Sequence, residues 1–99
     1  MTTTGVISEN NIDMAMRIYP NPFNDKLSVT FVSDGSAGES LEIYDLLGNL
    51  QKTISIRDKK AGSMVLNLDG NSLGLSEGVY FIRHKMTLGD ETQRLIYIK

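Results

Sequence analysis

The clearest sign of the fold is the run Lys26-Leu27-Ser28-Val29-Thr30-Phe31-Val32, in which apolar and hydroxyl-bearing side chains alternate from Leu27 to Phe31. Successive side chains along a β-strand point to opposite faces of the sheet. Leu27, Val29 and Phe31 therefore share one face, which we expect to be buried, and the residues between them share the solvated face. This pattern predicts a strand of an antiparallel sheet with one face against a core.

Similar short runs lie on both sides of this strand, separated by turn residues at the spacing typical of all-β sandwiches and barrels. Seven strands are expected, at residues 15–19, 26–32, 40–46, 50–56, 63–69, 79–87 and 92–98. In the later strands the residues expected to face the core are Leu41, Ile43, Met64, Leu66, Leu68, Tyr80, Ile82, His84 and Met86. No segment sustains an apolar period of 3.6 residues over ten positions, so no helix is predicted.

Glycine-containing segments connect these strands. We expect a loop at residues 34–39, a longer loop at residues 69–78, and tight turns at Leu47-Gly48-Asn49 and Gly89-Asp90. Seven strands in so short a chain imply two stacked sheets, that is, an all-β, immunoglobulin-like antiparallel β-sandwich. The Cys…Trp…Cys pattern of antibody domains is absent, because the chain has no cysteine and no tryptophan.

The chain divides into a polar tail and one domain. Residues 1–13 are rich in Thr, Ser, Glu and Asn, and we interpret them as a flexible linker remnant. They lack the basic and apolar regions of a secretory signal, so an extracellular domain of this kind would be a fragment of a larger parent protein. Residues 14–99 then form a single β-sandwich domain of ordinary size.

Composition argues against several function classes. The 99 residues include 10 basic and 12 acidic side chains, a net charge of −2, and no basic stripe favours nucleic acid. No apolar run approaches the ~20 residues of a membrane span, so no membrane insertion is expected. The absence of cysteine removes disulfides, thiolate nucleophiles and Cys-ligated metals.

Catalytic and metal-binding groups are sparse. The single histidine, His84, lies within a predicted strand, and we interpret it as a residue of the sheet face or rim. A Ser-His-Asp triad would have to recruit it, and no Gly-x-Ser-x-Gly motif is present. The aspartates at turns do not have the spacing of a calcium loop. These aspartates are Asp25, Asp34, Asp45, Asp69 and Asp90. No enzymatic activity, metal or cofactor is therefore predicted.

The most specific segment is Ile18-Tyr19-Pro20-Asn21-Pro22-Phe23-Asn24, which contains both prolines of the chain. Proline fixes φ and lacks an amide donor, so this segment must leave the sheet after the first strand. Each proline also biases the preceding residue toward extended geometry, which constrains Tyr19 and Asn21. The residues by themselves predict a stiff, extended corner between two sheet edges.

Four motifs follow one another along the chain. They are Tyr19-Pro20-Asn21-Pro22-Phe23, the run from Leu41 to Gly48, Gly78-Val79-Tyr80-Phe81-Ile82-Arg83, and the ending Arg94-Leu95-Ile96-Tyr97-Ile98-Lys99. Together they resemble the type A C-terminal sorting domain of type IX secretion system cargo in Bacteroidetes (the Por secretion system C-terminal domain family), over about residues 16–99. The flagellar hook-capping immunoglobulin-like family shares the first three motifs, and the basic-apolar ending favours the sorting domain.

This resemblance implies a non-catalytic secretion signal. Such domains direct cargo from the periplasm through the type IX outer-membrane translocon. A sortase-like peptidase then usually removes the domain and joins the cargo to anionic lipopolysaccharide. The implied protein partners are therefore the translocon and the peptidase, and the implied location is secreted or cell surface. Cleavage would fall in residues 1–13, where an exposed linker is accessible to a protease.

The last predicted strand is apolar on both faces over Leu95-Ile96-Tyr97-Ile98, although a two-layer sandwich buries only one face. The surplus face could dock the translocon or peptidase, the strand could extend a partner's sheet, or a loop could cover it. An edge-strand dimer is also open to such a fold. The candidate recognition residues are Tyr19, Pro20, Asn21, Pro22, Gly48, Gly78, Tyr80, Arg94, Leu95, Ile96, Tyr97, Ile98 and Lys99.

Two other functions compete with the secretion signal. One is an immunoglobulin-like accessory module that binds carbohydrate or protein within a larger extracellular protein, and the other is a structural assembly domain of the hook-capping type. A hydrolase ranks last, because the chain offers no plausible set of catalytic groups. The fold by itself does not distinguish the secretion signal, the accessory module and the assembly domain. The position of the domain in the parent protein does distinguish them, since a sorting signal must be the final domain.

Overall fold

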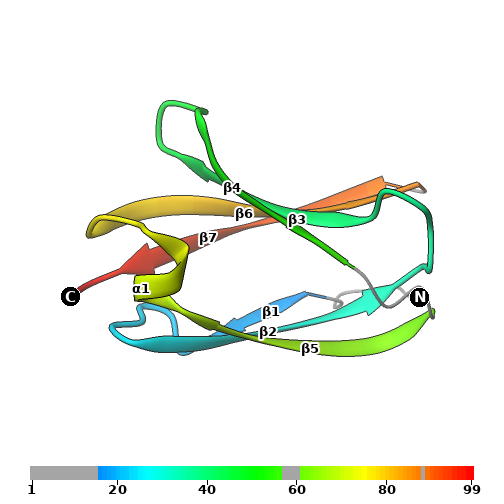
Figure 1. Cartoon of the computed structure of the whole chain (residues 1–99), viewed down its shortest axis with the longest axis horizontal. Coiled ribbons are helices and arrows are strands. Elements are labelled where there is room, and N and C mark those ends of the chain that lie inside the picture. The colour runs from blue at the N-terminus through cyan, green and yellow to red at the C-terminus, as the bar shows by residue number, and fades with distance from the viewer. Residues whose placement is uncertain (1–15, 57–60, 88) are drawn as a thin grey trace, which may run out of the picture.

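The computed structural model describes residues 16–56, 61–87 and 89–99, which form two sheets stacked face to face (Figure 1). The elements are β1 (Arg17–Tyr19), β2 (Lys26–Ser33), β3 (Ser40–Asp45), β4 (Leu50–Ser55), β5 (Gly62–Asp69), α1 (Gly70–Leu73), β6 (Gly78–Met86) and β7 (Gly89–Tyr97). The predicted all-β antiparallel sandwich of seven strands is confirmed. The linker predicted at residues 1–13 lies outside the described residues. Within the described ranges, no helix is long and apolar enough to cross a bilayer.

The two sheets differ in size. One contains three strands in the order β1-β2-β5, and the other contains four in the order β4-β3-β6-β7. All neighbouring strands in both sheets are antiparallel. In a constant-type immunoglobulin domain the fourth strand lies beside the fifth, whereas here β4 pairs with β3. The topology is therefore immunoglobulin-like, with the fourth strand in the opposite sheet.

The core forms where the alternation in the sequence predicts it. Leu27, Val29 and Phe31 of β2 are buried, and they pair across the ladder with the inward residues of β5. Ile82 and His84 face them from β6 and are fully buried. Burial of one large aliphatic or aromatic side chain stabilises a fold by roughly 1.5–3 kcal/mol. The buried apolar cluster consists of Met16, Phe23, Leu27, Val29, Phe31, Leu41, Ile43, Ile56, Leu73, Leu75, Tyr80, Ile82, Leu95 and Tyr97.

One helical turn, α1, interrupts the loop predicted at residues 69–78, where no helix was expected. The Asp69 carboxylate caps it, because its Oδ1 accepts the N–H of Asn71 at 2.8 Å. Four residues are too few to leave an apolar period of 3.6 in the sequence, so the pattern could not reveal this turn.

The hairpin between β6 and β7 also differs from the prediction. Gly89 and Asp90 were expected to form its turn, but they pair with Met86 and Lys85 as the first residues of β7. The Asp90 carboxylate accepts N–H groups of Arg83 on the neighbouring strand. Asp90 therefore belongs to the surface of the sheet.

The connections between strands gather at two opposite ends of the sandwich (Figure 1). Four segments meet at one end, which we call the Lys99 end: residues 20–25, 46–49, 70–77 and 98–99. Residues 34–39 and Thr87 lie at the other end, which we call the His84 end. Each of the four sequence motifs reaches the Lys99 end. Tyr80 pairs with both Asp45 and Leu95, which joins three of them, and the first motif reaches the same end through the bridge between Phe23 and Tyr97.

Candidate functional site

The outer edge of β7 is closed by the proline-containing segment. The N–H of Phe23 donates to the carbonyl of Ile96 at 2.9 Å, and the N–H of Ile98 donates to the carbonyl of Phe23 at 2.9 Å. Phe23 and Tyr97 thus form a parallel bridge outside the antiparallel sheets. Both Xaa-Pro peptide bonds in this segment are cis. The last part of β7 therefore has a neighbour on each side.

The side chain of Asn21 extends this closure. Its Nδ2 donates to the carbonyl of Arg94 at 2.7 Å, and its Oδ1 accepts the N–H of Ile96 at 2.9 Å. An amide side chain both donates and accepts, so it pairs with the strand as a backbone peptide would. The proline segment therefore closes the edge of β7, which the sequence left open to a partner's sheet, but it does not cover the outer face, where Ile98 and Arg94 stay exposed. With the corner in place, the backbone of residues 94–98 cannot extend a partner's sheet or form an edge-strand dimer.

Phe23 anchors the corner in the core. Its buried ring stacks on Tyr97, with ring centroids 4.6 Å apart and an interplanar angle of 14°. The ring of Tyr97 also lies against Gly70, where an added Cβ would come within 2.7 Å of the Tyr97 hydroxyl oxygen. Only glycine therefore fits at position 70 without displacing the ring. The backbone N–H of Gly70 donates to the carbonyl of Asp25 at 2.8 Å, which ties α1 to the same end.

The side chains of β7 divide between the core and the surface. Leu95 and Tyr97 are buried between the sheets. Ile96 is half-buried on the outer face, Ile98 is 49% exposed and Arg94 is exposed. A partner can therefore contact the outward side chains of this strand end without unfolding the domain, but not the inward ones.

These outward side chains continue an apolar area on the neighbouring strand. Val79 and Phe81 of β6 are half-buried on the outer face, and Val79 pairs directly with Ile96. Lys99 lies at the edge of this area, where its N–H donates to the carboxylate of Glu77 at 3.0 Å. The outer face at the Lys99 end thus combines apolar side chains with the basic Lys99 and the acidic Glu77.

Other predicted recognition residues serve the fold. The buried Tyr80 donates its hydroxyl to the carbonyl of Ser76 at 2.6 Å, which fixes the loop before β6. Gly78 begins β6 opposite Tyr97. Tyr19 is half exposed at the end of β1 and lies beside the proline corner. Gly78 and Tyr80 therefore contribute to the structure of the Lys99 end.

Gly48 belongs to the predicted turn between β3 and β4, which is confirmed. Its φ of 86° lies in the left-handed region that favours glycine. Oδ1 of Asp45 accepts the N–H groups of Leu47 and Asn49, each at 2.9 Å. The N–H of Asn49 is also the main cause of the lowered pKa of Asp45, since it stabilises the ionised carboxylate. This turn is held by several bonds to one side chain.

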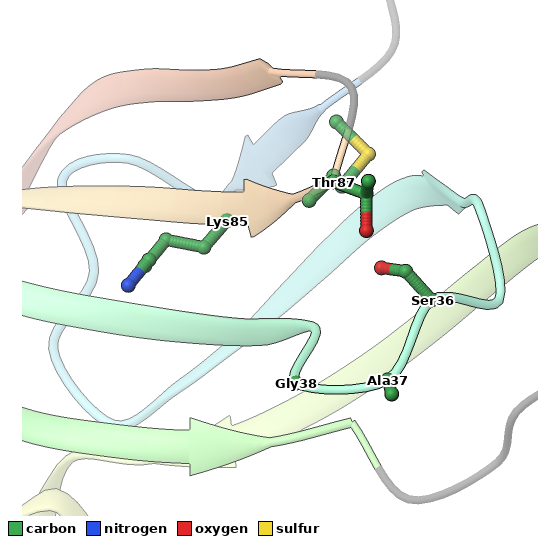
Figure 2. A pocket seen from close by; sticks show the side chains of 6 residues that line it. Ser36, Ala37, Gly38, Lys85 and Thr87 are labelled. Carbon is green, nitrogen blue, oxygen red and sulfur yellow. The ribbon is translucent and has the colours of Figure 1, made fainter.

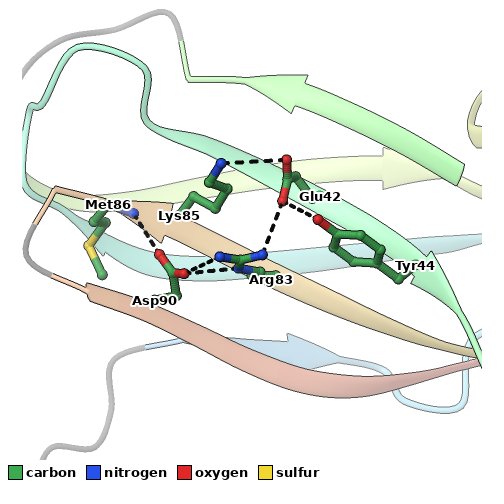
Figure 3. Close-up of polar contacts among 6 residues, drawn as sticks. All are labelled: Glu42, Tyr44, Arg83, Lys85, Met86 and Asp90. Atoms are coloured by element: carbon green, nitrogen blue, oxygen red, sulfur yellow. Dashed lines mark hydrogen bonds and ion pairs between the residues drawn. The ribbon is translucent and has the colours of Figure 1, made fainter. Parts of the chain in front are cut away.

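A chain of polar contacts crosses the outer face of the four-stranded sheet (Figure 3). Arg83 donates two N–H groups to Asp90 and lies 3.8 Å from Glu42, which also accepts the Tyr44 hydroxyl. The Arg83 guanidinium lowers the pKa of Asp90, and the bond to Glu42 raises the pKa of Tyr44. Lys85 lies 3.9 Å from Glu42. These charges are paired with one another.

The buried polar groups lie at the His84 end. Nε2 of His84 is 2.6 Å from Oε2 of Glu39, and the Ser33 hydroxyl donates to Oε1 of Glu39 at 2.6 Å. Nδ1 of His84 lies 3.9 Å from Oε1 of Glu91. His84 is on a sheet face, as interpreted from the sequence, and that face is the fully buried one. No spacing in the sequence linked Glu39 to His84.

This cluster does not have the order of a nucleophilic triad. In such a triad the imidazole accepts the serine proton and the carboxylate orients the imidazole. Ser33 instead donates to Glu39, and all three side chains are buried. In the parts of the chain that are described, no three His, Asp or Glu side chains are grouped to hold a metal ion. The arrangement fits a structural contact between the loop at 34–39 and β6.

Hollows lie at both ends of the sandwich. At the His84 end, Ser36 and Thr87 face each other across a hollow of about 140 Å³ (Figure 2). At the Lys99 end, Pro20, Pro22 and Ile98 line an open hollow of about 360 Å³. Small-molecule sites usually have ~300–1,000 Å³ and enclose most of the ligand. The first hollow is too small for that, and the second is open enough to accept a side chain of a protein partner.

Comparison with known families matches the secretion system C-terminal sorting domain to residues 17–99 of this chain. The chain belongs to this family. The sorting domain is thus of the kind that type IX secretion systems use to export proteins. Comparisons with curated proteins and with solved structures found no match. The match covers all seven strands of the sorting domain, including the corner and β7.

Proposed function

We propose that this sorting domain is a non-catalytic secretion signal whose Lys99 end is read by the type IX outer-membrane translocon. The observation that carries the proposal is the split of side chains along β7. Leu95 and Tyr97 complete the core, whereas Arg94, Ile96 and Ile98 face outward. Apolar residues on an outer sheet face add little to a two-layer fold, and such patches are typical of protein interaction sites.

The covered edge of β7 limits how a partner can bind. Because Asn21 and Phe23 occupy the backbone groups of residues 94–98, recognition must use side chains. The side chains that a partner can contact at this end are those of Arg94, Ile96, Ile98 and Lys99 and the exposed prolines of the corner, Pro20 and Pro22. Arg94 and Lys99 add positive charge beside the apolar residues, which suits an apolar groove with an acidic rim.

The domain acts, on this proposal, as the last part of a larger parent protein. The parent crosses the periplasm and is released or attached at the cell surface. On the same proposal, a sortase-like peptidase cleaves upstream of residues 14–99, within the polar segment at residues 1–13. The sorting domain supplies no reacting group to that cleavage.

A reporter fusion tests the proposal. Deletion of residues 94–99 would also remove the buried Leu95 and Tyr97, so the sharper change is Ile96→Thr with Ile98→Thr, which keeps the backbone and the core. We expect export of a fluorescent reporter in a type IX-competent bacterium to fall about tenfold, the effect of losing roughly 1.4 kcal/mol of contact. The matched control is Val32→Thr with Val65→Thr, two exposed valines on the three-stranded sheet.

The result also separates the competing functions. If the intact chain does not deliver an unrelated reporter to the surface, the secretion signal is wrong and an accessory carbohydrate- or protein-binding module, or a hook-capping-like assembly domain, takes its place. If the reporter is exported equally with Ile96→Thr and Ile98→Thr, the signal stands but is not read at β7. Thermal melting of each purified variant verifies that it is folded.

A further inference from the structure

The turn between β3 and β4 carries apolar side chains that the fold does not use. Leu47 is 86% exposed, Leu46 is 64% exposed and Leu50 is 52% exposed. Figure 1 shows this turn rising away from the two stacked sheets at the Lys99 end. Leucine has no role in turn geometry, which depends on Asp45 and Gly48. The leucines are therefore free to serve contacts outside the chain.

The turn presents these leucines in a fixed geometry. The N–H of Gly48 donates to the carbonyl of Asp45 and the N–H of Asp45 to the carbonyl of Asn49, both at 3.0 Å. The Asp45 carboxylate also accepts from the amide of Gln51 at 3.0 Å. An ordered turn loses little conformational entropy on binding, so apolar side chains on it bind with less cost than those on a mobile loop.

The charge around the turn favours a protein partner over a lipid surface. From Asp45 to Gln51 the sequence contains one carboxylate and no basic residue. Peripheral binding to anionic lipid depends on clustered Lys and Arg beside the apolar residues. The acid at position 45 has its oxygens bonded to N–H groups of its own turn. A neutral apolar pocket in a protein is the complementary surface.

The turn is also continuous with the surface proposed for recognition. Leu50 pairs with Tyr44, and Tyr44 pairs with Phe81 across β3 and β6. On β6, Val79 lies two residues before Phe81 on the same face, and it pairs with Ile96 of β7. Outward side chains thus lead from the turn to the end of β7 across a single sheet face.

We infer that the β3–β4 turn is a second contact of the sorting domain, and that Leu46 and Leu47 insert into an apolar pocket of the same protein partner that reads β7. This inference rests on the proposed function. The recognised surface then has two parts, the outward side chains of β7 and the tip of the hairpin, held at a fixed spacing by the four-stranded sheet.

The test uses the whole chain fused to the reporter. Leu46→Ser with Leu47→Ser removes the apolar tip and keeps Asp45 and Gly48, and Leu47→Ser by itself is the milder variant should the pair fail to fold. We expect export to fall about tenfold for the pair while the melting temperature stays unchanged. The control Val32→Thr with Val65→Thr removes exposed apolar surface from the other sheet, and the reporter fused to it should be exported normally.

The outcomes separate this inference from the proposed function. Normal export of the leucine variants together with a loss for Ile96→Thr and Ile98→Thr overturns the second contact and leaves the proposed function intact. Normal export of every variant removes the second contact and the reading of β7, and leaves only the secretion signal itself, which rests on export by the intact chain. Co-sedimentation of the wild-type chain with phosphatidylglycerol-containing vesicles, abolished by the leucine pair, would show a membrane contact instead and likewise overturn the inference.

Discussion

The two ends of the sandwich are built in different ways. At the Lys99 end the chain closes its own sheet edge with backbone bonds from Phe23 and side-chain bonds from Asn21, and the buried groups are apolar or aromatic. At the His84 end a carboxylate, an imidazole and a hydroxyl are buried together. The stability of the first end depends on packing, and that of the second depends on the contacts of Glu39 with His84 and Ser33.

Because of this difference, the side chains that stabilise the domain are distinct from those that a partner can contact. The Lys99 end can expose apolar side chains such as Leu47 and Ile98 because its core is already complete beneath them. The His84 end has its unusual groups inside, where no partner can reach them. Changes that remove an anchor at either end should therefore destabilise the domain, whereas changes at the exposed leucines should leave it folded.

The largest effect is expected when the anchor of the Lys99 end is removed. Phe23→Ala deletes a fully packed ring stacked on Tyr97 and should lower the free energy of unfolding by about 4 kcal/mol, as large-to-small changes in cores do. Urea denaturation followed by circular dichroism measures it. Leu47→Ala is the exposed control at the same end and should stay within about 0.5 kcal/mol of wild type. Equal losses in the two variants would contradict the division between anchor and surface.

The next effect concerns the His84 end. Glu39→Ala leaves His84 and Ser33 buried without their carboxylate and should lower the free energy of unfolding by about 3 kcal/mol. Glu39→Gln retains a polar group in the same place and should cost clearly less. Glu77→Ala, at the exposed surface of the other end, is the matched control. A loss below about 1 kcal/mol for Glu39→Ala would mean that the cluster is not structural.

The smallest effect is the pH dependence of the β3–β4 turn. The pKa of Asp45 is lowered in the folded state from its ordinary 3.8, first by the N–H of Asn49. Its contribution to stability is therefore complete above the unfolded pKa and is lost as the pH falls through the lower, folded pKa. Carboxyl NMR titration should place the Asp45 midpoint below 3.8, and protonation should reduce the protection factor of the Leu47 amide, that is, its protection relative to the unfolded chain at the same pH. The variant Asp45→Asn should lack this step. A midpoint at or above 3.8 would show that these bonds do not favour the ionised form.

The fold could be predicted because its main signals are local. Alternation in residues 26–32 and in the later strands gave the inward faces correctly, including that of His84. The turn at Gly48 was also readable, since few residues tolerate its φ. The short helix α1 and the pairing of Gly89 and Asp90 in β7 could not be predicted, because single turns and strand ends leave no periodic pattern.

The sequence by itself determined the strands, their buried faces and the family, since alternation and short motifs depend on near neighbours in the chain. Only the tertiary structure decided which motifs meet. Asn21 and Phe23 close β7, and Glu39 meets His84, across separations at which no spacing rule applies. Such contacts depend on how the two sheets stack, and stacking is a property of the whole set of side chains rather than of any one segment.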